Sequence, residues 1–242
     1  MGTASLFALP ISLSFIRCEA EAVLLRSGAC NDGRQSGLVR CAGGLAALCA
    51  AMLLASGCNQ GPSRIEAPDW DPPALAERIV SELDENGDAH VDGQEWTAAP
   101  GLAAGARFID NDKDGRLSRE EIEARFQLYR ELRVGLRSRA FRVTYKGRPV
   151  AGADTLFLPE PFLEGVIEPA HGKTDEQGIV VPHSQGQDLP GMRIGLYRVQ
   201  VRSPRLKIPA KYTNDATMLG VEASPVSDDA AAYGVTELRL TD

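Results

Sequence analysis

Apolar residues early in the chain recur at the spacing of an amphipathic helix. Leu75, Ile79 and Leu83 lie four residues apart, so they share one helix face. Asp71 stands where a side chain can cap the first turn, and the two prolines that follow it are tolerated there. The pattern predicts a helix from about residue 71 to residue 83, with Trp70 docked against it.

A longer helix is predicted to follow residue 118. Ser118 and Glu121 have the spacing of a capping box, in which each side chain bonds the other residue's backbone N–H. An apolar face follows at helical spacing, formed by Ile122, Phe126 and Tyr129. Polar residues, Arg125 among them, fill the opposite face, and Gly135 is expected to end the helix.

Two shorter helical segments are predicted between these helices. Trp96 begins the first of them, and Pro100 with Gly101 breaks it. Residues 102–109 form the second, with Phe108 and Ile109 facing the helix that follows.

From Ala140 the pattern changes to short runs of β-forming residues separated by turn residues. The predicted strands are 141–145, 155–158, 179–181, 194–201, 218–222 and 235–240. Turn signals at this density predict an antiparallel β-sandwich. The fold class is therefore expected to be α+β and multidomain, with the helical part first.

Two acidic segments of twelve residues, 84–95 and 110–121, interrupt the helical part. Each places oxygen-bearing side chains at positions one, three, five, nine and twelve, the spacing that surrounds a Ca²⁺ ion. Mg²⁺ is disfavoured because it requires tight octahedral geometry and keeps its waters. The expected ligands of the first segment are Asp84, Asn86, Asp88, the carbonyl of His90, Asp92 through a water, and both oxygens of Glu95. Those of the second are Asp110, Asp112, Asp114, the carbonyl of Arg116, Ser118 and Glu121.

The two segments differ at position six, where the backbone turns through positive φ and glycine is preferred. Gly115 meets this need in the second segment, whereas the first has Ala89, for which the turn costs about 1–2 kcal/mol. The first site is therefore expected to be the weaker one. Val91 and Leu117 occupy position eight, and we expect them to pair as a short β-link between the segments.

Paired segments of this kind resemble an EF-hand pair, here over residues 74–136. The β-rich region carries further motifs: GRPVAGA at 147–153, GKTDEQG at 172–178 and GLYRV at 195–199. In order and spacing they resemble the carboxypeptidase regulatory-like, transthyretin-like sandwich domains over residues 140–242. The resemblance implies a non-catalytic immunoglobulin- or transthyretin-like sandwich, often attached to other modules, and it implies no shared ligand.

Residues 42–57 form an apolar, Ala- and Leu-rich run, with Arg34 and Arg40 before it and Cys58 after it. A basic flank, a short apolar core and small residues before a cysteine resemble a bacterial lipoprotein signal. The resemblance implies that the signal region 1–57 is cleaved. An uncleaved membrane anchor and a plain signal peptide are the alternatives.

In a lipoprotein of this kind, Cys58 becomes the lipidated first residue and anchors the chain to a membrane through a tether, residues 58–73. All five cysteines lie at or before Cys58, which argues against a disulfide framework in the folded part. The protein is then expected on the periplasmic side of the cell envelope. Asn59 after Cys58 favours the outer over the inner membrane.

Charge and motifs limit the classes of function. Without residues 1–57, which hold four of the 26 Lys and Arg and three of the 33 Asp and Glu, the net charge is −8. An acidic surface disfavours nucleic acid as a partner. His171 and His183 lack the third ligand of a zinc site, and no nucleophile elbow or phosphate-binding loop is present, so no enzyme is expected. Three carboxylates on a Pro- and Gly-rich loop are expected to be solvated, namely Glu160, Glu164 and Glu168.

The sequence thus predicts a lipid-anchored, calcium-binding envelope protein whose sandwich serves as a scaffold or binds a protein partner. One alternative is a dockerin-like module, although dockerin repeats usually lack a helix before the first loop and often end in Asp. Another is an accessory module that targets a separate hydrolase or a polysaccharide.

Overall fold

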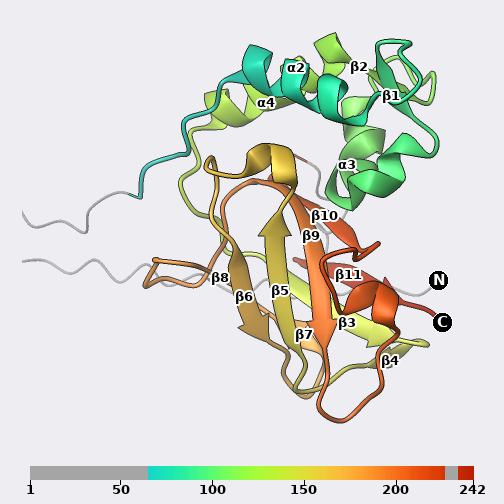
Figure 1. Ribbon diagram of the computed structural model, residues 1–242. Helices are drawn as coiled ribbons and strands as arrows, with labels where there is room; N and C mark the ends of the chain where they lie inside the picture. Colours follow the sequence, from blue (N-terminus) through green and yellow to red (C-terminus); the bar gives the residue numbers. More distant parts are fainter. Residues whose placement is uncertain (1–64, 227–233) are drawn as a thin grey trace, which may run out of the picture. The chain divides into compact units, whose positions relative to one another are not determined.

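The computed structural model describes residues 65–226 and 234–242, which belong to one compact unit, Pro62–Asp242. The predicted signal region, Cys58 and the beginning of the tether lie outside these residues. The described part has an α+β fold in which a helical segment precedes a sheet-rich region (Figure 1). No helix within it is long and apolar enough to cross a membrane.

The helical segment begins with α2, Pro72–Leu83, as the apolar periodicity predicted. The Asp71 side chain caps it by accepting a hydrogen bond from the N–H of Ala74 at 3.3 Å. The predicted apolar face is buried, with Ile79 fully excluded from solvent. The prediction of this helix is therefore confirmed in both its start and its buried face.

The second predicted helix is α4, Arg119–Leu132, and both hydrogen bonds of the Ser118–Glu121 capping box are present. Its last residue is Leu132, and Arg133 caps its C-terminus in a left-handed conformation (φ 48°). The prediction that Gly135 ends this helix was therefore wrong. Gly135 has another role, since a Cβ there would lie 2.0 Å from the carbonyl oxygen of Ile65. Trp70, 3% exposed, places its ring against Phe126 and Tyr129 of this helix.

Between α2 and α4 the chain forms a 3₁₀ turn, η1 (Glu95–Ala98), and helix α3 (Pro100–Ile109). The segment around Trp96 ends at Ala98, before Pro100, as predicted, and Pro100 also begins α3, two residues before the predicted start. A proline is well suited to the first helical position because the N–H it lacks has no partner there. Ile109 is buried as predicted, whereas Phe108 is only half-buried.

The sheet-rich region contains two sheets. The order β10-β9-β5-β6-β8 describes the first, and its strands are Gly220–Ala223, Gly195–Arg202, Asp154–Pro159, Ala170–Lys173 and His183–Ser184. The order β11-β3-β4 describes the second, in which β7 also pairs with β3, and its strands are Val235–Leu240, Ala140–Tyr145, Arg148–Pro149 and Ile179–Val180. Two further 3₁₀ turns are η2, Pro161–Leu163, and η3, Ala210–Tyr212.

One strand pair corrects the prediction that all pairs are antiparallel. β11 runs parallel to β3, with Val235 opposite Ala140 and Leu240 opposite Tyr145. A parallel pair needs a long connection, and here the intervening strands of the region supply it. The rings of Phe141 on β3 and Phe157 on β5 pack at a tilt with their centroids 4.9 Å apart, and this contact joins the two sheets.

Helix α3 packs against β10 and β9 (Figure 1). The approach is close enough that a Cβ at Gly220 would lie 1.9 Å from the carbonyl oxygen of Pro100. The buried apolar residues of the helical segment and of the sheets belong to one continuous core. The acidic loops between the helices are therefore attached to a rigid, packed base.

Candidate metal centre

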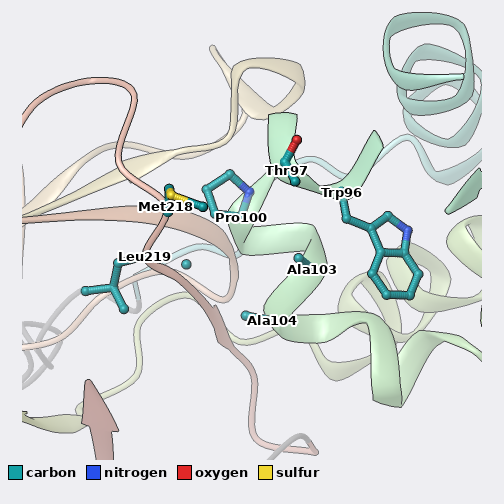
Figure 2. A pocket seen from close by; sticks show the side chains of 8 residues that line it. Trp96, Thr97, Pro100, Ala103, Ala104, Met218 and Leu219 are labelled. Carbon is teal, nitrogen blue, oxygen red and sulfur yellow. The ribbon is translucent and has the colours of Figure 1, made fainter. Parts of the chain in front are cut away.

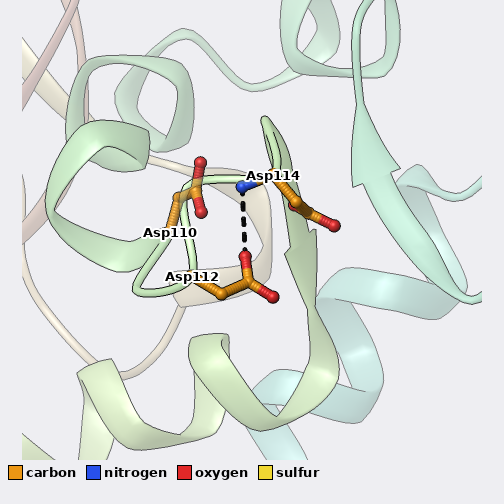
Figure 3. Close-up of side chains that lie close together, drawn as sticks. All are labelled: Asp110, Asp112 and Asp114. Carbon is orange, nitrogen blue, oxygen red and sulfur yellow. Dashed lines mark hydrogen bonds between the residues drawn. The ribbon is translucent and has the colours of Figure 1, made fainter.

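The second acidic loop brings three carboxylates together. One oxygen from each of Asp110, Asp112 and Asp114 lies within 4.8 Å of the others, and no comparable group of His, Cys, Asp or Glu occurs elsewhere in the described residues. All three side chains project from one turn of backbone that follows α3 (Figure 3). The arrangement is a cluster of hard oxygen donors, as the sequence spacing predicted.

Backbone N–H groups hold this loop in a ring around its first residue. Asp110 accepts from the N–H of Lys113 at 2.6 Å through Oδ1 and from that of Gly115 at 3.0 Å through Oδ2. Asp112 Oδ1 accepts from the N–H of Asp114 at 3.1 Å, the bond drawn in Figure 3. Because these bonds fix the loop's curvature, the carboxylates are grouped by the backbone itself.

Glu121, the twelfth residue, closes the loop. Its Oε1 accepts from the N–H of Asn111 at 2.8 Å and its Oε2 from that of Ser118 at 2.9 Å. Partial burial opposes ionisation of this carboxyl, but the hydrogen bonds from Ser118, Asn111 and Asp112 outweigh burial and lower its pKa. Glu121 is therefore held ionised at the first turn of α4, where the helix dipole also favours negative charge.

Arg116 bonds one of the three carboxylates, that of Asp114, which a metal ion would also bind. Its backbone N–H bonds Asp114 Oδ1 at 2.8 Å, while its guanidinium reaches Oδ2 at 3.1–3.2 Å. These contacts, the backbone bond above all, lower the pKa of Asp114. The guanidinium is exposed, so displacing it from Asp114 requires little free energy.

The first loop has the same backbone pattern. Asp84 accepts from the N–H of Gly87 at 2.7 Å and of Ala89 at 2.9 Å. Glu95 accepts from the N–H of Glu85 and of Asp92, both at 2.9 Å. The structure does not, however, group three of its acidic or histidine side chains as it does in the second loop.

Position six has the same backbone conformation in both loops. Ala89 has φ 65° and Gly115 has φ 83°, so both adopt the left-handed turn that the sequence pattern required. A Cβ on Gly115 would meet no atom within 4 Å, so the strain on an alanine at this position comes from the backbone alone.

The two loops are joined as predicted. Strands β1 (His90–Asp92) and β2 (Arg116–Ser118) pair antiparallel, with Val91 directly opposite Leu117. Both position-eight side chains are fully buried. The imidazole of His90 contacts the carbonyl oxygen of Asp88 at 2.9 Å.

Two buried carboxylates from the sheet region hold the segments that flank the loops. Glu222 on β10, 4% exposed, accepts from Arg125 Nε at 2.7 Å and from the hydroxyl of Tyr129, both on α4. Arg125 was predicted on the polar face of this helix, but it is 8% exposed and is buried together with Ile122, Phe126 and Tyr129, so that prediction was wrong. Arg125 is the charged residue on this otherwise apolar face, and it meets a carboxylate of the sheet.

Glu160 was also predicted wrongly, since it is fully buried. Its Oε1 accepts from the N–H of Gly101 in the first turn of α3 at 2.5 Å, and its Oε2 from Arg198 Nε at 2.6 Å. Burial raises the pKa of this carboxyl, although both hydrogen bonds oppose the shift. No local sequence pattern reveals either buried carboxylate, because the partners lie 38 to 97 residues apart.

A pocket of about 390 Å³ adjoins the first loop (Figure 2). Trp96, the residue after Glu95, forms one wall and donates its indole N–H to the carbonyl oxygen of Val91 at 2.7 Å. Pro100 of α3 and Met218, 64% exposed, lie on the opposite side. The lining is largely apolar and offers no group for chemistry.

The remaining histidines lie opposite each other on β6 and β8, since His171 pairs with His183 in the register. Both are exposed, and no third ligand joins them within the described residues. Comparison of the chain with protein-family models, curated proteins and solved structures gave no match.

Proposed function

We propose that this chain is a calcium-binding protein of the bacterial cell envelope. The two acidic loops form an EF-hand pair, and the observation that supports this most directly is the grouping of Asp110, Asp112 and Asp114 within one turn. The sheet-rich region is a transthyretin-like sandwich without catalytic function that serves as a scaffold or receives a protein partner.

The donor set favours Ca²⁺ over other ions. Carboxylate, hydroxyl and carbonyl oxygens are hard ligands, and Ca²⁺ accepts six to eight of them in flexible geometry, whereas Mg²⁺ demands a small octahedron. Asp110, Asp112, Asp114, Ser118, Glu121 and the carbonyl of Arg116 would hold the ion in the second loop. The matching residues of the first loop would hold a second, weaker ion.

The cell envelope sets how the ion would act. Extracellular calcium sites bind with dissociation constants of about 10⁻⁴–10⁻³ M. At ten times the dissociation constant, occupancy adds about 1.4 kcal/mol to folding stability. Sites filled nearly all the time would make this a structural calcium, and a dissociation constant below about 10⁻⁶ M would instead indicate a sensor.

Attachment to the membrane through lipidated Cys58, on the periplasmic side and in the outer membrane, completes the proposal. It rests on the apolar run and the cysteine that follows it in the sequence. Mass spectrometry of the protein from a bacterial host tests this point. A mature chain that begins at a diacylglyceryl Cys58 supports it, and a chain that begins elsewhere contradicts it.

The dockerin-like alternative is the weaker one, because α2 is the kind of entering helix that dockerin repeats usually lack. Recovery of partners from envelope extract, with and without a chelator, distinguishes a calcium-organised interface from an accessory role. A single partner lost on chelation supports the interface, and release of a hydrolase supports the accessory role.

Calorimetric titration of the full chain with Ca²⁺ tests the metal assignment. We expect two binding events for the native chain, loss of the tighter one in D112N, and little heat with Mg²⁺. The matched control is E120Q, which removes an exposed carboxylate of the same loop that is not at a ligand position. Equal loss of binding in both variants would show that general acidity, and not the ligand set, attracts the ion.

A further inference from the structure

A groove of about 820 Å³ lies on the sheet-rich region. Leu158 on β5 and Arg198 on β9, which are register partners, form part of its floor. The segment after η2 forms one wall, and Asp215, beyond η3, lies on another side. Its volume falls in the range of about 300–1,000 Å³ that is typical of ligand sites.

The lining combines apolar surface with more negative than positive charge, and one of its carboxylates, Asp215, already accepts a hydrogen bond from Gln200 Nε2 at 2.7 Å. Three carboxylates line it: Glu164, Glu168 and Asp215. Arg198 is the one cation of the lining, and its guanidinium already bonds Glu160 and the carbonyl oxygen of Ala98, both at 2.6 Å. Glu168 pairs with Arg193 at 3.1 Å, whereas no cation pairs with Glu164 or Asp215 among the described residues.

The wall offers acceptors and few donors. Three of its residues are prolines, which have no N–H: Pro159, Pro161 and Pro169. The N–H groups of Glu164 and Val166 already bond the carbonyl oxygens of Pro161 and Leu163. A ligand that fits this lining therefore supplies hydrogen-bond donors and positive charge, and it has apolar surface to cover Leu158 and the partly buried Val166.

We propose that this groove binds an extended segment of a protein partner that carries a lysine or arginine between aliphatic or proline residues. Such a side chain lays its methylene stem on apolar surface while its charged end reaches a carboxylate. The groove is several times larger than one lysine side chain, so flanking residues are needed to fill it. Glu164 and Asp215 bind the cation, and Leu158 with Val166 contacts the stem.

The walls are held in place by the helical segment. Arg78 of α2 donates to the carbonyl oxygen of Phe162 in η2 at 3.2 Å. Arg198 reaches the carbonyl oxygen of Ala98, three residues beyond the first acidic loop. The proposal deepens the proposed function by naming the partner's chemistry, and its groove exists whether or not the loops bind calcium.

Titration of the full chain, at low salt, with a blocked proline–lysine–proline tripeptide tests the proposal by NMR. We expect saturable shifts in the groove residues, with an affinity about tenfold weaker in the E164Q/D215N double variant, the effect of losing two exposed ion pairs at low salt. The control E176Q removes an exposed carboxylate from the turn between β6 and β7 and leaves binding unchanged. Far-UV circular dichroism and calcium titration of each variant report separately on folding and on the metal sites.

Several outcomes would overturn the proposal. Equal binding of a tripeptide with norleucine in place of lysine removes the role of charge. Binding of 1,5-diaminopentane as tight as that of the tripeptide assigns the groove to small organic cations. Unchanged affinity in the double variant, or no binding by the native chain, would show that the groove does not bind such a peptide. Loss of calcium binding with retained peptide binding contradicts only the proposed function.

Discussion

Breaking the buried contact between α4 and β10 is expected to destabilise the fold strongly. Glu222 is 4% exposed and Arg125 8% exposed, and their atoms Oε1 and Nε are 2.7 Å apart. E222Q removes the carboxylate while keeping the shape of the side chain. Removing one partner of a buried ion pair costs about 3–5 kcal/mol, because the other charge stays buried.

Two further variants separate the charge from the hydrogen bond. Y129F removes the hydroxyl that donates to Glu222 and keeps the ring in its contacts with Trp70 and Phe126. Loss of a hydrogen bond to a charged group costs about 1.5–3 kcal/mol. Because both residues act on one carboxylate, the effects of E222Q and Y129F are expected not to add in the double variant.

The assay is urea unfolding of each full-length variant at saturating calcium and again in chelator. The unfolding free energy is expected to be highest for the native chain, lower for Y129F and lowest for E222Q, with or without the ion. Because Ser118 caps α4 and Glu121 lies in its first turn, E222Q is also expected to weaken calcium binding at the second loop. An unfolding free energy for E222Q within about 0.5 kcal/mol of the native value, the range of ordinary surface substitutions, would refute the buried contact.

Three other predictions concern single positions. A89G removes backbone strain at φ 65° and is expected to strengthen the first calcium site, measured by calorimetry, by about 1 kcal/mol. G135A is expected to destabilise the chain by more than about 1 kcal/mol in urea, because its Cβ would lie 2.0 Å from a backbone oxygen of Ile65. For Glu160, burial raises the pKa above the ordinary 4.5, so its stabilising contribution is present below that value and is lost as pH rises through the folded-state pKa. The unfolding free energy of the native chain is therefore expected to fall relative to that of E160Q over this window.

Each of these has a control. G115A makes the opposite change to A89G at position six of the second loop, and it is expected to weaken calcium binding there. G147A, in a turn where a Cβ would meet no atom within 4 Å, separates backbone strain from the clash at Gly135. A difference between native and E160Q that is constant from pH 4 to pH 8 would contradict the raised pKa.

Sequence patterns predicted the helices whose formation depends on neighbouring residues. The four-residue spacing of Leu75, Ile79 and Leu83 and the capping box at Ser118 each depend on neighbours in the sequence, and both are present in the structure. Strands β4, β6 and β8 were missed because they are only two to four residues long and show no alternation of apolar residues.

In the candidate site, too, the features that depend on neighbouring residues were predicted, and those that depend on distant segments were not. Ligand spacing alone brought Asp110, Asp112 and Asp114 together, because a twelve-residue loop sets its own curvature through its backbone N–H groups. The burial of Glu160 could not be predicted, because it results from packing between distant segments. Arg125 lies three residues after Ile122 and four before Tyr129, so helical spacing places it on the buried face, although its partner Glu222 is distant in the sequence. A charged residue on a loop or on a polar helix face has the same sequence signature whether it meets water or a buried partner.

The most direct test of calcium binding is a crystal structure of the full chain grown with Ca²⁺, with the ion located by its anomalous scattering. We expect an ion bonded to oxygens of Asp110, Asp112, Asp114 and Glu121, at about 2.3–2.6 Å from each. Carboxylates that remain on their backbone N–H partners in millimolar calcium, with no ion between them, would contradict it.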